Sequence, residues 1–280
     1  MHPVYVHIKE ELSPFYAEEE ASAMAKWISS DILHLSTLEL YTGKDMNFST
    51  KEWAELEDIL RRLKQREPLQ YILQEASFCG RSFHVEQGVL IPRPETEELV
   101  EWIVSDYRKA GQVRILDIGT GSGCIPVSLA QLLPEAVVSS CDVSAEALRI
   151  AAMNVKRYGD KVTLFCADIL KEELSECQVD VLVSNPPYIT ESERTDMEAN
   201  VLDWEPELAL FVPDSDPLRF YRRIARKGLD WLSEGGALYF EINRAYGAET
   251  VRMLEELGYR QIELRKDLSG NDRMIKAIRP

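Results

Sequence analysis

Residues 115–123 read Ile115-Leu116-Asp117-Ile118-Gly119-Thr120-Gly121-Ser122-Gly123, an apolar run that ends in three alternating glycines. The apolar run predicts a buried strand of a parallel sheet, and the apolar segment from about Cys124 to Leu133 predicts a following helix. Glycines permit positive φ and let the backbone approach a ligand closely. The stretch therefore predicts the first strand–turn–helix unit of a doubly wound α/β fold, with a ligand at the turn.

The next two predicted strands end at acidic residues. The second strand ends at Asp142, and Ser144 is expected to cap the next helix. Doubly wound folds place a carboxylate at about this position, where it accepts hydrogen bonds from ribose hydroxyls. The third strand, residues 162–166, leads to Asp168 and Ile169, which suit the amino group and the ring face of adenine. A nucleoside cofactor is expected, although Asp168 is also typical of a helix cap.

The glycine pattern narrows the choice of cofactor. It is G-x-G-x-G followed by Cys124, whereas dinucleotide sites favour G-x-G-x-x-G and phosphate-binding loops carry a lysine that this stretch lacks. S-adenosylmethionine is therefore favoured over a dinucleotide or a nucleoside triphosphate. No cluster of potential ligands indicates a metal.

Asn185-Pro186-Pro187-Tyr188 follows a further apolar run, residues 179–184. Proline has a fixed φ and no N–H, so two in succession hold a rigid turn whose carbonyl oxygens are free acceptors. With the Asn185 amide oxygen and the Tyr188 ring, the turn suits a planar –NH2 group of an amide or an aminopurine. The alternative is a stiff loop without a ligand.

In this order, the segments resemble class I S-adenosylmethionine-dependent methyltransferases that act on an amino nitrogen. Residues 91–100, Ile-Pro-Arg-Pro-Glu-Thr-Glu-Glu-Leu-Val, and residues 205–210, Glu-Pro-Glu-Leu-Ala-Leu, resemble the HemK/PrmC family more specifically. Residues 266–273 match that family's closing strand–turn–strand, although Leu268-Ser269-Gly270 departs from its usual shorter turn. The resemblance covers essentially the whole chain.

The resemblance implies a seven-stranded Rossmann-like sheet with a small N-terminal helical bundle. It implies an enzyme that uses S-adenosylmethionine to methylate the glutamine of the Gly-Gly-Gln loop in peptide-chain release factors. The expected catalytic residues are Asn185, Pro186, Pro187 and Tyr188. The expected cofactor-binding residues are Gly119, Thr120, Gly121, Ser122, Gly123, Asp142, Asp168, Ile169, Asn185 and Arg93, with pairing to Glu95 the alternative for Arg93.

Three domains are predicted: a helical substrate-recognition domain over 1–70, a β-hairpin linker over 71–90 and a catalytic domain over 91–280. In the first, a helix is expected from Ser13-Pro14 to about Leu35, and Ser49-Thr50-Lys51-Glu52 is a capping box.

Further elements are expected outside this helical domain. Residues 78–85 predict two strands around a glycine turn, and residues 237–242, 261–266 and 274–278 predict the last strands, including an antiparallel hairpin. Trp27, Trp53 and Trp102 fall on apolar stripes and are expected in the core.

Composition limits the class of partner. The formal net charge of −16 disfavours direct binding to a polyanion and favours a basic protein. The five cysteines form no C-x-x-C pair and are mostly expected as small buried residues in a reducing cytoplasm, and no membrane-spanning segment is indicated. The alternatives are a methyltransferase for a ribosomal-protein glutamine or for adenine N6, and a non-catalytic binding protein.

Overall fold

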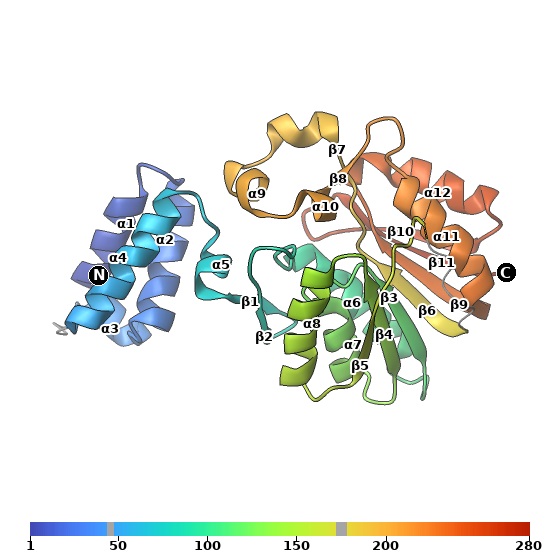
Figure 1. Ribbon diagram of the computed structural model, residues 1–280, viewed down its shortest axis with the longest axis horizontal. Helices are drawn as coiled ribbons and strands as arrows, with labels where there is room; N and C mark the ends of the chain where they lie inside the picture. Colours follow the sequence, from blue (N-terminus) through green and yellow to red (C-terminus); the bar gives the residue numbers. More distant parts are fainter. Residues whose placement is uncertain (44–47, 172–177) are drawn as a thin grey trace. The chain divides into compact units, whose positions relative to one another are not determined.

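The computed structural model describes residues 1–43, 48–171 and 178–280. These residues form two compact units (Figure 1). One unit comprises Met1–Leu73 together with Ala199–Trp204, and the other comprises Gln74–Glu198 and Glu205–Pro280.

The first unit is helical. Its elements are α1 (Pro3–Leu12), α2 (Glu18–Trp27), the π-helix η1 (Ile28–Ile32), α3 (Thr37–Thr42), α4 (Thr50–Lys64), α5 (Leu69–Leu73) and α9 (Ala199–Trp204). The expected capping box opens α4: the Ser49 hydroxyl accepts from Glu52 N–H, and the Glu52 carboxylate accepts from Ser49 N–H. Leu56, Leu60 and Leu63 of α4 are buried, so the unit has its own apolar core.

The predicted helix from Ser13 to Leu35 is wrong in its first part. Ser13 is the C-cap of α1, and α2 begins only at Glu18. Pro3, and not Pro14, occupies the opening position of a helix. Three glutamates in the first turn of α2 face the positive end of the helix dipole, which favours the later start.

The three tryptophans differ in burial. Trp102 is buried as expected, and Trp27 is half-buried. Trp53 remains 40% exposed, because the buried stripe of α4 begins one turn later, and its ring packs edge-on against Phe48 and His7. The prediction that Trp53 lies in the core is wrong.

The second unit contains a seven-stranded sheet, which confirms the predicted fold class. Its strands are β3 (Arg114–Ile118), β4 (Val137–Asp142), β5 (Val162–Cys166), β6 (Val179–Ser184), β9 (Leu232–Glu241), β10 (Arg260–Lys266) and β11 (Asp272–Ile278). The order is β10-β11-β9-β6-β3-β4-β5. β11 runs antiparallel to β9 and β10, whereas the other pairs are parallel. The closing antiparallel hairpin is confirmed, and β9 begins five residues before the predicted strand.

Helices cover both faces of this sheet (Figure 1). The core with α6 (Pro94–Tyr107) and α7 (Cys124–Leu132) contains Val181 and Val183, and α8 (Ala145–Arg157) contributes Val155 to it. The core with α11 (Arg219–Trp231) and α12 (Gly247–Glu256) contains Leu182. Successive side chains of a strand point to opposite faces, so the consecutive apolar residues 181–183 of β6 supply both cores.

Shorter elements complete the second unit. They are β1 (Glu75–Phe78), β2 (Arg81–His84), β7 (Ile189–Thr190), the 3-10 helix η2 (Glu191–Asp196), α10 (Glu207–Leu210), β8 (Phe211–Val212) and the 3-10 helix η3 (Arg244–Tyr246). The predicted hairpin is present as β1 and β2, with Gly80 at φ 68° in its turn. Leu268 lies in the β10–β11 turn and is 95% exposed, so the departure from the family pattern falls on the surface.

The cysteines follow their predicted role only in part. Cys124 and Cys141 are buried and Cys79 is half-buried, but Cys166 is exposed at the end of an edge strand. Cys177 lies outside the described residues.

Gly123 provides a test of the packing beneath the glycine turn. Its φ is 82°, and an added Cβ would lie 3.2 Å from Ala151 Cβ. Gly111 has a similar φ of 72° but open space around it. We expect Gly111→Ala to cost about 1–2 kcal/mol from the backbone conformation alone and Gly123→Ala to cost about 1–3 kcal/mol more from overpacking. Urea unfolding of both variants measures the difference, and equal midpoints would contradict the close contact with α8.

Candidate active site

The carboxyl ends of β3, β4 and β6 meet at one edge of the sheet and border a cavity of about 570 Å³. Open α/β sheets bind ligands at this edge, and the volume suits a small organic ligand. Most of the predicted site residues line the cavity: Arg93, Gly119, Thr120, Gly121, Ser122, Asp142, Asp168, Ile169, Asn185, Pro186 and Pro187. Gly123 and Tyr188 do not line it.

The glycine turn is fixed by backbone hydrogen bonds. The N–H groups of Gly119 and Thr120 both donate to the Cys141 carbonyl oxygen, at 2.8 and 3.0 Å. Gly119 has a φ of 85°, and an added Cβ would lie 3.9 Å from the Asn185 carbonyl oxygen. The turn therefore lies between the end of β4 and the turn that follows β6.

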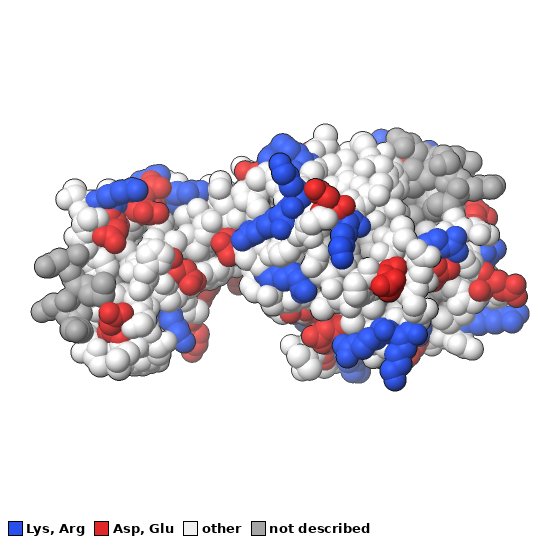
Figure 2. Space-filling model, turned by 90° about the horizontal axis from the view of Figure 1, so that it is seen from below, with Lys and Arg blue, Asp and Glu red and all other residues white. Residues whose placement is uncertain are grey.

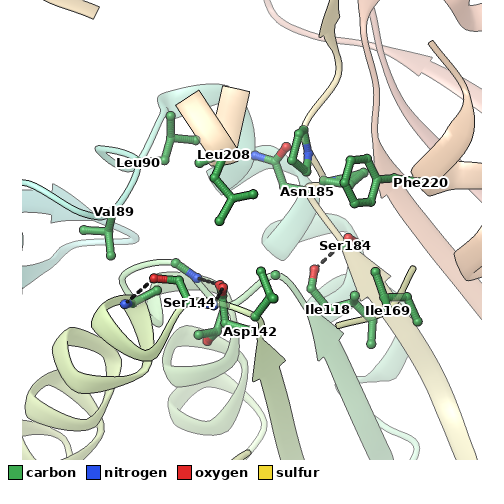
Figure 3. Close-up of a pocket in the computed structure, with 18 of the residues that line it drawn as sticks. Val89, Leu90, Ile118, Asp142, Ser144, Ile169, Ser184, Asn185, Leu208 and Phe220 are labelled. Carbon is green, nitrogen blue, oxygen red and sulfur yellow. Dashed lines mark hydrogen bonds between the residues drawn. The ribbon is translucent and has the colours of Figure 1, made fainter. Parts of the chain in front are cut away.

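Asp142 is held at the base of the cavity, across from Leu208 and Asn185 (Figure 3). Its Oδ2 accepts from Gly121 N–H at 3.0 Å, and its Oδ1 accepts from Ser144 N–H at 2.9 Å. Burial raises the pKa of Asp142, and the backbone N–H groups only partly oppose that effect. A carboxylate has about four acceptor positions, so these backbone donors leave capacity for a ligand hydroxyl. Ser144 caps α8 as predicted.

Asp168 and Ile169 form another part of the wall. Asp168 Oδ1 accepts from Leu170 N–H at 3.0 Å, and Lys171 Nζ lies 3.1 Å from its Oδ2. Burial acts to raise the pKa of Asp168, but the Lys171 and backbone hydrogen bonds outweigh it and lower the pKa. Asp168 thus accepts a hydrogen bond from the backbone two residues later, as turn residues do, and it also lines the cavity.

The turn after β6 leaves two acceptors open. Asn185 Nδ2 donates to Thr96 Oγ1 at 3.2 Å. Among the described residues, no hydrogen bond reaches Asn185 Oδ1 or the Pro186 carbonyl oxygen. These two oxygens are the acceptors that the sequence predicts for an –NH2 group.

Tyr188 is tied to the strand beside this turn. Its hydroxyl donates to Glu241 Oε1 at 3.2 Å, and its carbonyl oxygen accepts from Asn243 Nδ2 at 3.0 Å. Burial raises the pKa of Tyr188, so the phenol stays a hydrogen-bond donor at neutral pH. Stacking of this ring on a substrate remains a prediction.

Arg93 pairs with Glu205 rather than Glu95. Arg93 Nη2 lies 2.5 Å from Glu205 Oε1, and Ile91 N–H donates to Glu205 Oε2 at 3.1 Å. The Glu205 carboxylate is almost fully buried. This ion pair joins the segment before α6 to the segment before α10 at the cavity.

Thr96 and Glu241 are site residues that the sequence alone did not indicate, although both lie within the predicted segments 91–100 and 237–242. Glu241 is the last residue of β9, which pairs in parallel with β6, so its carboxylate lies at the same sheet edge as Asn185. Side chains at the carboxyl ends of neighbouring parallel strands gather at one edge, and that rule applied to the predicted strand 237–242 would have identified it.

Comparison with known proteins defines the class. Residues 96–203 match the Methyltransferase small domain family. The structure of the T. thermophilus 16S rRNA N2 G1207 methyltransferase, in complex with AdoMet and guanosine, matches with a TM-score of 0.53 and 17% identity over 74% of this chain and 50% of that chain. A methyltransferase from Pyrococcus furiosus matches with a TM-score of 0.51 and 15% identity over 82% and 98%, respectively. The fold and the matched domain are those of a class I S-adenosylmethionine-dependent methyltransferase.

Full-length relatives define the family. Residues 5–73 match the PrmC N-terminal domain. The release factor glutamine methyltransferase of Bacteroides thetaiotaomicron is 50% identical over 100% of both chains, and that of Flavobacterium psychrophilum is 43% identical over 95% of this chain and 94% of its own. This chain belongs to the release factor glutamine methyltransferase family.

Asp142 offers a direct test of the cofactor site. A hydrogen bond to a charged group contributes about 1.5–3 kcal/mol, so Asp142→Ala should weaken S-adenosylmethionine binding by about 10- to 100-fold. Glu146→Gln is the control, because it removes a nearby charge on α8 outside the cavity lining. Calorimetry of both variants, with circular dichroism to verify folding, would exclude Asp142 from the site if the affinity of Asp142→Ala were unchanged.

Proposed function

We propose that this enzyme methylates the side-chain amide nitrogen, N5, of the glutamine in the Gly-Gly-Gln motif of peptide-chain release factors. The observation that carries the proposal is the pair of open acceptors, Asn185 Oδ1 and the Pro186 carbonyl oxygen, on the turn beside the glycine loop. Family membership supports the release factor as the substrate.

The cavity residues fit S-adenosylmethionine. Asp142 has acceptor positions for the ribose hydroxyls, and Asp168 with Ile169 presents a carboxylate and an apolar side chain for adenine. The positive charge of Arg93 is offset by Glu205, and that of Lys171 by Asp168. Arg219 also lines the cavity, and its guanidinium lies over the Phe220 ring. When bound, the cofactor supplies an electrophilic methyl group on a sulfonium.

The chain's own contribution is to orient a weak nucleophile. An amide nitrogen shares its lone pair with the carbonyl and must pyramidalise and gain positive charge as it reacts. Asn185 Oδ1 and the Pro186 carbonyl oxygen would accept its two hydrogens, which turns the lone pair outward and stabilises the developing charge. A general base is not required, because the methylated nitrogen is acidic and releases its proton to water.

We propose that the helical unit recognises the release factor. Leu38 and Tyr41 lie one turn apart on α3 and are 71% and 59% exposed. Exposed apolar and aromatic side chains that share a helix face are typical of protein contacts. The pair is therefore the best-defined candidate anchor on this unit.

A protein partner is also favoured over nucleic acid by charge. The net charge is −16, and Lys and Arg lie interspersed with Asp and Glu on the face in Figure 2. Nucleic-acid sites concentrate positive side chains instead. No described helix is long and apolar enough to cross a membrane, and a release-factor substrate favours a cytoplasmic location.

The reaction can be tested with labelled S-adenosylmethionine and a purified release factor, followed by mass spectrometry of the methylated residue. By analogy with the loss of one oxyanion-hole donor, Asn185→Ala should lower turnover by about 10²–10³-fold, with a smaller loss in cofactor affinity. A release factor with alanine in place of the Gly-Gly-Gln glutamine is the substrate control. Label on another residue would overturn the proposed reaction. Wild-type turnover by Asn185→Ala at saturation would remove this turn from the mechanism.

The helical unit can be tested in the full-length chain. Replacing Leu38 and Tyr41 together by alanine should raise the KM for an intact release factor by about 5- to 30-fold, as the loss of one or two interface anchors does. Cofactor affinity should stay unchanged. Val137→Ala is the matched control, because Val137 is also exposed but lies at the start of β4, away from the site. An unchanged KM would remove this surface from recognition.

A further inference from the structure

We infer that Glu241 and Thr96 are positioning residues that set the orientation of the Asn185 side-chain amide, so that its oxygen, and not its nitrogen, faces the substrate. The inference rests on the proposed function and specifies how the acceptor is prepared. Its basis is a chain of hydrogen bonds that runs from the buried carboxylate of Glu241 through the Thr96 hydroxyl to the side-chain amide of Asn185.

The first step is the position of Glu241. β6 and β9 are parallel neighbours, with Ser184 opposite Phe240, so Asn185 and Glu241 follow equivalent positions of adjacent strands. Thr96 lies in the first turn of α6 above this edge. Glu241 and Thr96 are 1% and 3% exposed, so water cannot readily replace their hydrogen bonds.

The second step is the direction of the hydrogen bonds. Thr96 Oγ1 lies 2.6 Å from Glu241 Oε2. An ionised carboxylate only accepts, so the single hydroxyl proton of Thr96 must point to Glu241. Because that proton is already used, Thr96 Oγ1 can only accept a hydrogen bond from Asn185. The neighbour at 3.2 Å must therefore be Asn185 Nδ2, which directs Oδ1 away from Thr96.

The third step is what the opposite orientation would cost. A flipped Asn185 would place Oδ1 against the acceptor Thr96 and present an –NH2 group to the substrate –NH2 group. Two donors would face each other, and neither substrate hydrogen would gain an acceptor at Asn185. The Glu241 charge thus selects the amide orientation that methyl transfer needs.

Glu241 also fixes the other side chain of the turn. Its second oxygen, Oε1, accepts from the Tyr188 hydroxyl at 3.2 Å. The positive charge of Arg273 on β11 lies near enough to favour the ionised carboxylate, although burial raises the pKa of Glu241. One carboxylate therefore organises both Asn185 and Tyr188.

Near-isosteric substitutions test this chain of hydrogen bonds. Glu241→Gln keeps the shape but can donate to Thr96, so both amide orientations become accessible. Thr96→Val keeps the shape but removes the hydroxyl, whereas Thr96→Ser restores it. We expect kcat to fall by about 10- to 100-fold in Glu241→Gln and Thr96→Val, as misplaced catalytic groups do. Thr96→Ser should remain within about threefold of the wild type.

A structural role alone would not give this pattern. The dissociation constant for S-adenosylmethionine by calorimetry and the KM for the release factor should change by less than about threefold, so the loss falls on kcat. The double variant Glu241→Gln/Thr96→Val should lose no more than either single variant, because both break one chain. If Glu241→Gln does not fold, the comparison of Thr96→Val with Thr96→Ser decides.

Two outcomes separate this inference from the proposed function. If Asn185→Ala loses turnover while Glu241→Gln and Thr96→Val retain wild-type kcat, the positioning role is wrong and the proposed function stands. If the wild-type enzyme transfers no label to the Gly-Gly-Gln glutamine, the proposed function fails. If Asn185→Ala methylates the release factor at the wild-type rate, the acceptor role of Asn185 is wrong, and this inference fails with it. Equal losses in Thr96→Val and Thr96→Ser would also overturn the inference, because the hydroxyl would then not be the relevant group.

Discussion

Parallel pairing of β6 with β3 on one side and β9 on the other is the constraint on which the site depends. All three strands end at the same sheet edge, so the glycine turn, Asn185 and Glu241 become neighbours although they are far apart in the chain. The consecutive apolar residues 181–183 of β6 make this possible, because a central strand must bury side chains on both faces. Helices on both faces then exclude water from the sheet, and only its edge remains for chemistry.

Three acidic side chains are buried at or near this edge of the sheet. Asp117 is fully buried beneath the glycine turn, and burial raises its pKa to about 7, while Ser140 donates a hydrogen bond to it. Asp142 and Glu241 are buried at the carboxyl ends of β4 and β9, and burial raises both pKa values. Each of the three carboxylates accepts hydrogen bonds from donors that the fold holds in place. The orientation of these side chains therefore depends on the native packing around them.

Much of the fold could be predicted because local patterns and tertiary demands agree. Apolar runs that end in Gly119, Asp142 or Asn185 are strong strand signals, and Ser49 and Glu52 specify a helix start. The failures have identifiable causes. The apolar periodicity of residues 13–35 does not reveal that residues 13–17 lie between α1 and α2. Trp53 follows the apolar spacing of α4 but lies before its buried stripe. The partners of Arg93 and Asn185 come from residues more than 80 positions away, and local patterns do not carry such pairings.

The hydrogen bonds within the glycine turn have a kinetic consequence. Gly119, Thr120 and Gly121 already donate their N–H groups to Cys141 and Asp142. The conformational entropy of this backbone is therefore lost when the chain folds, and not when a ligand binds. A preformed wall needs no slow rearrangement before a ligand enters. Side-chain changes around it should therefore alter the residence time of the cofactor far more than the rate at which it arrives.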